Sequence, residues 1–382
     1  MSFFLSFKEI WRNKGRYLLF SLVIALITTL VLFIAALAGG LSKANREYID
    51  NIQAELLVYQ DEADLIISAS RLDNSTLTNL RRIEGVADAG GIGFSSATVV
   101  YPPVKNGIDV NLIGTEPGRP GNPEILSGQA LIRDRANEAV IDTPLAESLG
   151  VQPGDLITIQ TVQGTEKEFY NLTVVGLSGS NQYFFQPAVF TPIQTWDDIK
   201  PQESGTRRSA RVIFNIAAVQ LYNSENIAEM TPVIEDNISD VQAVDKATAI
   251  LALPGYTAQQ STLNTQQAFT LLIGVLVLGG FFQIQTIQKI GQIGMLKAIG
   301  TGNSTVAGMT ILQIVTISVF GVLLGVIGTF LIAMGMPDEI PAEFNSTAIL
   351  GAITALLVIG PIGGLVSIRL ALKVEPLRAI GL

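Results

Sequence analysis

The sequence predicts a polytopic α-helical membrane protein with four transmembrane helices and a large extracellular α/β domain between the first and second spans. The chain of 382 residues is 48% hydrophobic and only 15% charged, which is too apolar for an ordinary soluble protein. Its apolar residues are concentrated in four long uncharged runs, and an acidic segment of mixed composition, 43–265, separates the first run from the other three.

The four uncharged runs are 26, 42, 40 and 25 residues long, and they cover 17–42, 247–288, 298–337 and 344–368. A helix needs roughly 20 apolar residues to cross a bilayer. Each run therefore holds one span, and we place the spans at Tyr17–Ala38, Phe269–Ile287, Val306–Met334 and Thr347–Ile368. The polar stretch 257–267 belongs to the second run, and we expect it to form a helical stalk outside the hydrocarbon.

The predicted organisation has three parts. Residues 1–42 form an amphipathic N-terminal helix and the first span, 43–265 form the extracellular domain with its stalk, and 266–382 form the other spans. The amphipathic helix follows from the helical spacing of its apolar residues, Phe3, Phe4, Phe7, Ile10 and Trp11. An alternative is a signal peptide cleaved after "ALA" at 36–38. The apolar stretch is longer than a signal core of roughly 7–15 residues, which favours a retained anchor.

The charge distribution predicts the orientation. Residues 1–16, 289–297 and 369–382 would share one side of the membrane, and they carry nine basic and two acidic residues. The other side carries 15 basic and 31 acidic residues. Short cytoplasmic segments are enriched in Lys and Arg. We therefore expect a multi-pass protein of the cell membrane with both termini in the cytoplasm.

The acidic segment reads as mixed α/β. The stretch 156–177 has two strand-like runs around "QGTEKE", which predicts a hairpin. Further strands are expected at "ATVVYPP" (97–103) and "IDVNLIG" (108–114), and a helix followed by a turn over 76–91. Residues 142–155 predict a short helix that Thr143 caps, Pro144 begins and Gly150 ends.

Composition excludes most catalytic chemistry. The chain has no Cys and no His, so thiolate nucleophiles, imidazole metal ligands and Ser-His triads are absent. The string "DEAD" at 61–64 has no accompanying Walker sequence, and the net charge of −9 argues against nucleic acid. Asp197 and Asp198 could hold a cation, but a solvated acidic surface is the stronger interpretation. We expect neither an enzyme nor a resident metal or cofactor.

The glycine-rich segment "KIGQIGMLKAIGTGNST" (289–305) lies between the second and third spans. It lacks the G-x-x-x-x-G-K-[ST] pattern of a phosphate loop. Apolar residues at near-helical spacing predict a short helix along the inner membrane face and a turn at Gly300–Asn303. Ser304 and Thr305 are the expected caps of the third span. Either the helix only closes the bundle, or it docks into a groove of another protein.

Part of this segment, "QIGMLKAIG" (292–300), resembles the inner-loop signature of the FtsX-like, MacB-type (type VII) ABC permeases. The layout of spans and the tail "VEPLRAIG" (374–381) are similar too. Within this family, the chain resembles the haem-efflux permeases of Gram-positive bacteria more than the other branches. The resemblance to that branch rests on "TIQKIGQIGMLKAIG" (286–300), on "LAGGL" (37–41) and on Gln292, where the wider family usually has Glu.

The resemblance implies that 289–303 is a coupling helix that docks on a separate cytoplasmic ATPase, which would bind ATP and Mg²⁺. The residues expected to make this contact are Ile290, Ile293, Gly294, Met295, Leu296, Lys297 and Ile299. It also implies a homodimer of the permease. Gly321 and Gly325 form a G-x-x-x-G in the third span, which suits either a dimer contact or packing within one subunit.

The family implies export by mechanotransmission, in which ATPase motion moves the outer domain. Haem would be the transported substrate. Without His, its iron would be held by Met, Tyr or a carboxylate. The candidates near the outer membrane face are Glu47, Tyr48, Met334 and Met336, with Arg46 and Lys43 for the propionates and Tyr256 as a weaker candidate. The alternatives are export of a lipid or antimicrobial peptide, or a non-transporting scaffold that relays ATPase motion to an extracellular partner.

Overall fold

The computed structural model describes residues 14–101, 107–202, 212–336, 340, 342–344 and 346–373. The chain divides into two compact units, which are Met1–Leu41 with Gln260–Leu382, and Ser42–Gln259. We call the first the helical unit and the second the inserted domain. The predicted amphipathic helix before residue 14 and the tail motif at 374–381 lie outside the described residues.

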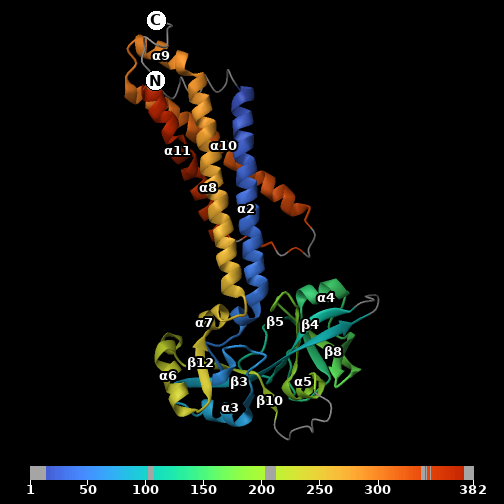
Figure 1. Ribbon diagram of the computed structural model, residues 1–382. Coiled ribbons are helices and arrows are strands. Elements are labelled where there is room, and N and C mark those ends of the chain that lie inside the picture. The colour runs from blue at the N-terminus through green and yellow to red at the C-terminus, as the bar shows by residue number, and fades with distance from the viewer. Residues whose placement is uncertain are drawn as a thin grey trace. The chain divides into compact units, whose positions relative to one another are not determined.

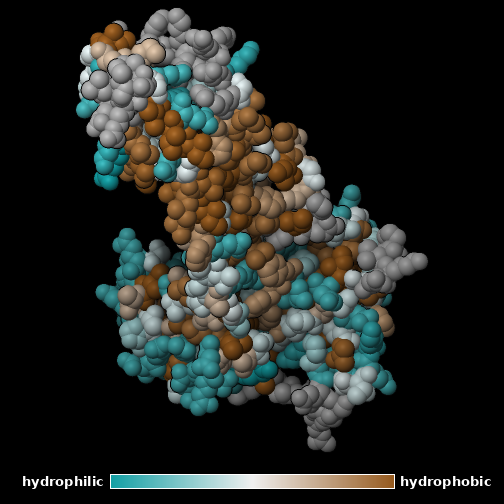
Figure 2. All heavy atoms as spheres, turned by 45° about the horizontal axis from the view of Figure 1, so that its top comes forward, coloured by the Kyte–Doolittle hydropathy of each residue, from teal (hydrophilic) through white to brown (hydrophobic). Residues whose placement is uncertain are grey.

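Long apolar helices make up the helical unit (Figure 1). They are α2 (Lys14–Asn51), α8 (Tyr256–Gln288), α10 (Asn303–Met334) and α11 (Ser346–Lys373), and the short α9 (Ile290–Ala298) follows α8. The four long helices are long and apolar enough to cross a membrane, as the sequence predicts. Figure 2 shows their hydrophobic side chains on the surface, where a bilayer would solvate them. The polar stretch 257–267 is helical and continuous with the second span, as expected for the stalk.

The G-x-x-x-G of α10 packs against α2 of the same chain. A Cβ on Gly321 would lie 2.5 Å from Cβ of Ile24, and one on Gly325 would lie 2.4 Å from Cβ of Thr28. The hydroxyl of Thr29 donates to the Gly325 carbonyl at 3.1 Å. Small residues allow two helix backbones to approach closely. Of the two readings of this motif, the structure supports packing within one subunit.

A second close approach joins α8 to α11. A Cβ on Gly363 would lie 3.0 Å from the backbone nitrogen of Gly279. One on Gly360 would lie 2.2 Å from the hydroxyl of Ser318 on α10. The side chains of Leu278, Phe282 and Ile314 are buried between these helices. Small residues thus set the helix spacing, and large apolar ones fill the interior of the unit.

The inserted domain is built on a ten-stranded mixed sheet with the order β12-β1-β11-β3-β4-β9-β6-β8-β5, and β7 pairs with β3 and β8. Its strands are β1 (Leu56–Gln60), β3 (Val86–Val100), β4 (Ile108–Thr115), β5 (Ile125–Gly128), β6 (Glu138–Asp142), β7 (Leu156–Gln163), β8 (Glu166–Ser178), β9 (Ala188–Pro192), β11 (Ile216–Leu221) and β12 (Val241–Asp245). The short strands β2 (Leu72–Asp73) and β10 (Ile213–Phe214) form a separate pair.

Both faces of the sheet are buried. Neighbouring residues of a strand point to opposite faces, so their hydrophobic clusters show which face each belongs to. In β1, Leu56 and Val58 belong to one hydrophobic cluster, whereas Leu57 and Tyr59 belong to another. The helices that accompany the sheet are α3 (Asn74–Leu80), α4 (Thr143–Leu149), α5 (Ile193–Ile199), α6 (Ile227–Asn237) and α7 (Lys246–Leu251). The inserted domain therefore has two hydrophobic layers, one on each face of its sheet.

Several predicted elements are confirmed. The hairpin over 156–177 is β7 and β8, with Gly164 in the turn at φ +62°. The expected strands near 97–103 and 108–114 are parts of β3 and β4. The helix expected over 76–91 is shorter, because α3 ends at Leu80 and residues 86–91 pair in the sheet.

Two cap assignments were wrong. Asp142, not Thr143, is the N-cap residue of α4, and the Thr143 hydroxyl donates instead to the Ser178 carbonyl at 2.7 Å. Likewise α10 begins at Asn303 after Gly302, so Ser304 and Thr305 lie inside its first turn. In both cases the chain enters the helix one or more residues earlier than the polar residues suggest. Gly150 ends α4 at φ +68°, as predicted.

Candidate functional site

The coupling segment consists of α9 and the turn that follows it. Lys289 is the N-cap residue of α9 and Ile299 ends it. Gly300 has φ +92°, a conformation that favours glycine, and its N–H donates to the Lys297 carbonyl at 3.0 Å. The N–H of Thr301 donates to the Leu296 carbonyl at 3.0 Å. The predicted short helix and turn are therefore present.

The predicted coupling residues fall into two sets. Met295 and Ile299 are 63% and 78% exposed, and Ile290 is exposed less strongly. Ile293 and Gly294 are buried, and Ile293 packs with Val306 and Ala371. Leu296 is half-buried, as is Lys297, which donates to the Leu372 carbonyl at 2.6 Å. One side of α9 is therefore attached to α10 and α11, and the other presents apolar side chains outward.

Lys289 is buried at the junction of α8 and α9, with 7% of its surface exposed. Its ammonium donates to the hydroxyl of Tyr17 on α2 at 2.8 Å and to Oε1 of Gln313 on α10 at 2.9 Å. It also lies 5.3 Å from the centre of the Tyr17 ring. An ammonium buried among apolar helices is stable only when hydrogen-bonded in this way. Lys289 therefore joins the start of α9 to two spans.

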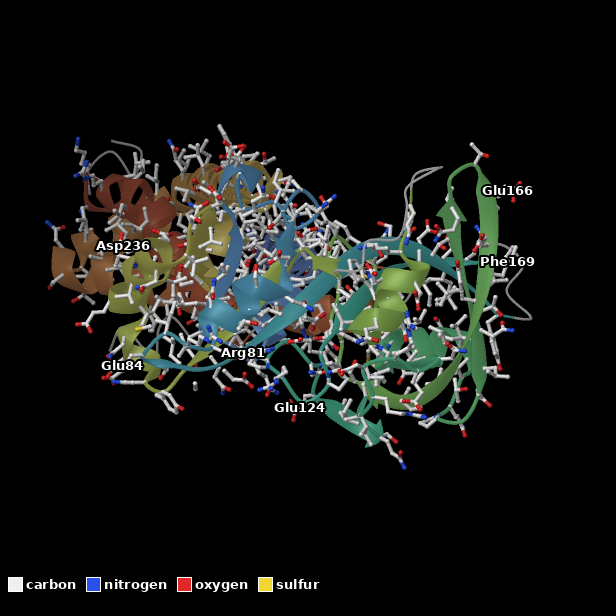
Figure 3. The ribbon with its side chains drawn as sticks, turned by 90° about the horizontal axis from the view of Figure 1, so that it is seen from below. Arg81, Glu84, Glu124, Glu166, Phe169 and Asp236 are labelled. Atoms are coloured by element: carbon white, nitrogen blue, oxygen red, sulfur yellow. The ribbon has the colours of Figure 1, made fainter. Side chains whose placement is uncertain are left out.

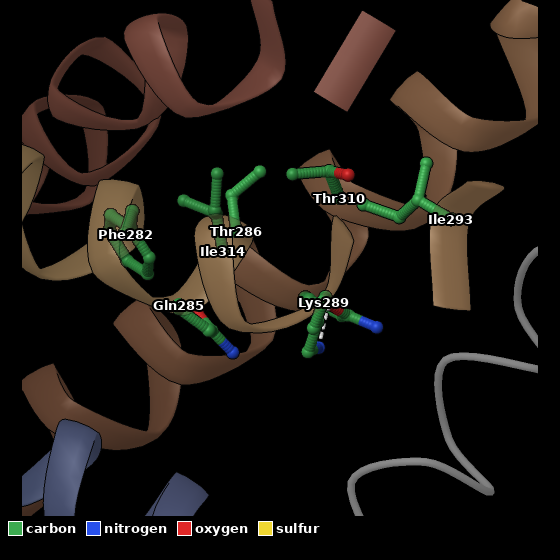
Figure 4. A pocket seen from close by; sticks show the side chains of 8 residues that line it. Phe282, Gln285, Thr286, Lys289, Ile293, Thr310 and Ile314 are labelled. Atoms are coloured by element: carbon green, nitrogen blue, oxygen red, sulfur yellow. Dashed lines mark hydrogen bonds between the residues drawn. The ribbon is translucent and has the colours of Figure 1, made fainter. Parts of the chain in front are cut away.

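A small polar cavity of about 20 Å³ adjoins this lysine (Figure 4). It is lined by Phe282, Gln285, Thr286, Lys289, Ile293, Thr310, Gln313 and Ile314. Its volume is that of about one water molecule. Nε2 of Gln285 is buried without a partner among the described residues. The signal for this junction in the sequence is a lone lysine at the end of a run of 42 uncharged residues, and the sequence pattern places that lysine only in the coupling segment.

Three of the substrate candidates lie on α2 within the inserted domain. Glu47 is 9% exposed, accepts a hydrogen bond from the Ser180 hydroxyl at 2.5 Å and pairs with Lys43 at 3.6 Å. Arg46 forms an ion pair with Asp50, one helical turn further on. Both charged groups are thus engaged in contacts within the inserted domain.

Tyr48 is a core residue. It is 2% exposed, and its ring lies 6.1 Å from that of Phe94, 6.3 Å from Tyr183 and 6.2 Å from Phe190. Burial raises the pKa of its phenol well above the ordinary value. In this conformation a ligand cannot reach the phenol oxygen. The prediction that Tyr48 contacts substrate therefore requires the inserted domain to open.

The two methionine candidates belong to the helical unit. Met334 ends α10 with 73% of its surface exposed, and Met336 follows it, half-buried. Tyr256, the weaker candidate, is buried, and its hydroxyl lies 2.9 Å from that of Ser42. Asp197 and Asp198 are paired with Lys200 at 2.6 Å and Arg135 at 3.0 Å. The described residues contain no cluster of acids suited to a metal ion.

Asp142 is the most perturbed carboxyl group in the inserted domain, and it is fully buried. Oδ2 accepts from the N–H groups of Ala188 at 2.9 Å and Asn181 at 3.4 Å, and Oδ1 has no partner among the described residues. Burial, with a smaller contribution from the negative charge of Glu47, raises the pKa of Asp142 to about 7, although the backbone hydrogen bonds to its carboxylate oppose this shift. Protonation of this one group therefore changes the stability of the inserted domain near neutral pH.

This raised pKa predicts a pH dependence of stability. The folded state binds the proton more tightly than the unfolded chain, whose carboxyl pKa is about 4. Stability should therefore increase as pH falls from 8 to 5, by on the order of 2 kcal/mol from this group. Trp196 is buried in the inserted domain and its fluorescence reports unfolding, once Trp11 is replaced by Phe. Asp142→Asn should flatten the slope, and an unchanged slope in this variant would assign the effect to other groups.

Two family descriptions match the chain. "MacB-like periplasmic core domain" matches residues 17–237, and "FtsX-like permease C-terminal" matches residues 267–376. Together they cover most of the four apolar helices and most of the domain inserted after the first of them.

Individual proteins are similar as well. The chain is 26% identical to the "Putative hemin transport system permease protein HrtB" of Staphylococcus haemolyticus over 377 residues, 99% of each chain. It is 24% identical to the "Macrolide export ATP-binding/permease protein MacB" of Psychrobacter arcticus over 48% of this chain and 32% of that one. The extracellular domain of the ABC-type transporter YknZ from Gram-positive bacteria covers 50% of this chain and all of that one, with 15% identity and a TM-score of 0.36.

Proposed function

The chain belongs to the family of FtsX-like permeases with a MacB-like periplasmic core domain, and from this premise we propose that it is the permease subunit of an ATP-driven efflux pump for haem or a similar hydrophobic amphiphile. One observation supports the proposed substrate class. The similarity to a relative named as a hemin transport permease extends over 99% of both chains, whereas the similarity to a macrolide exporter covers 48% of this one.

The energy source would be a separate ATPase. The sequence has no phosphate-binding loop, so ATP and Mg²⁺ would bind to the partner subunit. The exposed apolar side of α9, with Met295 and Ile299, is a suitable contact surface because large apolar side chains anchor protein interfaces. The basic residues near α9 and the C-terminal end of α11 favour a cytoplasmic position for this surface, and the inserted domain would then be extracellular.

Movement would pass from α9 into the spans by mechanotransmission. Ile293 and Lys297 hold α9 to α10 and α11, and Lys289 connects its start to α2. Both α2 and α8 continue from the helical unit into the inserted domain. A shift of α9 would therefore displace the two helices that lead to that domain. Two permeases would form the pump, and the dimer contact would use surfaces other than Gly321 and Gly325, which pack against α2.

This function is testable in liposomes. We expect ATP hydrolysis by the reconstituted permease and its ATPase to rise several-fold on addition of haemin. The physical reason is that a ligand which binds one conformation preferentially shifts the cycle toward it. A macrolide or lipid of similar size serves as the control. If only the lipid stimulates ATP hydrolysis, a lipid and not haem is the substrate. If no amphiphile stimulates hydrolysis, the result favours a non-transporting scaffold.

Haem binding by the isolated permease gives a second, direct test. Met336 and Met334 could supply a thioether to the iron, Glu47 a carboxylate and Arg46 a partner for a propionate, whereas Tyr48 would first have to leave the core. Titration with haemin should shift the Soret band, and Met336→Ala or Glu47→Ala should weaken binding about tenfold, the value of one lost contact of roughly 1.4 kcal/mol. Absence of any shift at micromolar haemin would contradict the proposed substrate.

A further inference from the structure

A two-residue turn in the inserted domain carries two phenylalanines in an unfavourable backbone conformation. Tyr183 and Gln186 close the turn, with hydrogen bonds of 3.1 and 3.2 Å between their backbones. Between them Phe184 and Phe185 have φ values of +48° and +64°. Two positive φ angles define a type I′ turn, which normally contains Asn and Gly because other side chains are strained there. Turn geometry alone therefore does not explain two aromatic residues at this place.

The turn is attached directly to α2. The N–H of Phe185 donates to the carbonyl of Ala44 at 3.1 Å, and the N–H of Tyr48 donates to the carbonyl of Gln182 at 3.0 Å. Ala44 and Tyr48 are four residues apart in α2, so the turn bonds to one side of a single helical turn. These two bonds hold Phe184 and Phe185 at one level along the helix.

Aromatic stacking supports the turn from the domain side. The ring of Phe184 stands edge-on to that of Tyr183, with centres 4.7 Å apart. Tyr183 in turn contacts Phe94 at 5.0 Å. Tyr183 is buried, yet Phe184 and Phe185 remain 38% and 49% exposed. The structure thus presents two large apolar side chains outward from a rigid support.

The position of Ala44 along α2 gives the depth of the turn. Ala44 lies three residues beyond the end of the apolar stretch if that end is Leu41, and six residues beyond it if the end is Ala38. At 1.5 Å per residue this is roughly 5–9 Å. The headgroup layer next to the hydrocarbon is roughly 5–8 Å thick. The turn therefore meets α2 at the depth where aromatic side chains are enriched in membrane proteins.

We propose that Phe184 and Phe185 form an interfacial anchor that inserts into the lipid headgroup region of the leaflet at which α2 leaves the membrane. The occupant of this apolar surface is then the lipid bilayer itself. The free energy of burying the two rings compensates for the strain of the turn. Such an anchor would need neither the transported substrate nor the ATPase, so it can be tested independently of the proposed function.

The chain has no cysteine, so a single nitroxide label can be placed without altering other positions. Full-length Phe184→Cys and Phe185→Cys proteins would be labelled and reconstituted in phosphatidylcholine–phosphatidylglycerol liposomes. We expect both labels to collide more with oxygen, which concentrates in lipid, than with a water-soluble nickel chelate. The control is Phe169→Cys on β8, an exposed position in the same domain, where nickel should dominate (Figure 3).

Two results would overturn the proposal. Labels at 184 and 185 that are as accessible to nickel as the label at 169 would place the turn in water. Labels shielded from both reagents would mean that a protein surface, such as a second copy of the chain, covers the rings.

If the cysteine variants fold poorly, Phe185→Trp in a Trp11→Phe background keeps an aromatic ring. The emission of the Phe185→Trp protein should fall in brominated lipid relative to ordinary lipid. The Trp11→Phe protein without this change, whose remaining tryptophan is the buried Trp196, should show no such fall.

A further variant separates the rings from the turn. Phe184→Asn/Phe185→Gly keeps the type I′ geometry and relieves the strain. In detergent we expect its inserted domain to unfold at a higher temperature than the parent, because Asn and Gly remove the backbone strain of the two positive φ angles. A lower unfolding temperature would mean that the rings stabilise the domain by internal packing, and this would contradict a role as a membrane anchor.

Discussion

Replacing Met295 and Ile299 with Asp is expected to prevent assembly of the permease with its ATPase. These two side chains are the most exposed apolar groups of the predicted coupling set. Burying one such side chain contributes about 1.5–3 kcal/mol, so losing both at an interface should weaken binding on the order of 100-fold or more. Binding would be measured by co-purification and by titration of the solubilised permease with the ATPase, and membrane insertion should persist.

The matched control keeps the apolar character of the same positions. Met295→Leu/Ile299→Val changes little in volume and should retain assembly. The structure also argues against testing this surface through Gly294, which is buried in α9. A charged residue there would disturb the packing of α9 against the bundle and mimic a loss of docking. Unchanged affinity in the double Asp variant would place the ATPase contact on another part of the chain.

Lys289→Met is expected to uncouple ATP hydrolysis from transport while leaving the ATPase bound. The substitution removes the hydrogen bonds from the buried ammonium to Tyr17 and Gln313. Buried polar groups that lose a partner cost roughly 1–3 kcal/mol each, so the junction between α9 and α2 should loosen. Haemin-stimulated hydrolysis should fall about tenfold or more, corresponding to roughly 1.4 kcal/mol of lost coupling. Lys289→Arg keeps the charge and should retain part of the stimulation.

A second variant distinguishes coupling from simple stability. Lys289→Met/Gln313→Leu/Tyr17→Phe replaces the ammonium and both of its hydrogen-bond partners with apolar groups, an exchange that is often neutral or stabilising. We expect the triple variant to recover the unfolding temperature of the parent but not the haemin-stimulated hydrolysis. If the triple variant recovers both, the hydrogen-bonded junction serves only to hold the helices together.

The fold could be predicted largely from local features of the chain. Uncharged runs of 25 residues or more mark the spans, because lipid requires continuous apolar helices. The alternation around "QGTEKE" predicted the β7–β8 hairpin, and the glycine turn after α9 was expected from Gly300. The cap residues of α4 and α10 differ from those expected, because Asp, Ser, Thr and Gly are all accepted at the N-cap and neighbouring candidates differ by only a few tenths of a kcal/mol.

The candidate site was predictable only in part. The coupling segment was recognised from its motif, and its division into an exposed and an attached side emerged from the packing of Ile293 against Val306 and Ala371. Glu47 and Tyr48 follow the first span in the sequence, which made them candidates for a membrane-level site. The structure instead engages Glu47 with Ser180 and encloses Tyr48 among aromatic rings. The contacts of Glu47 with Ser180 and of Tyr48 with Tyr183 join residues more than 100 positions apart, which no local pattern encodes.

The sequence by itself determined the number of spans, the insertion of a mixed domain after the first, and the family signature between the second and third. Each of these depends on hydrophobic length, periodicity or a contiguous motif, which are properties of neighbouring residues. Only the tertiary structure decided that Gly321 and Gly325 contact α2, that Lys289 bonds to Tyr17, and that Phe184 and Phe185 are fixed beside Ala44. Those outcomes depend on which helices and loops meet in space, and distant contacts arise from the packing of the whole chain rather than from local preference.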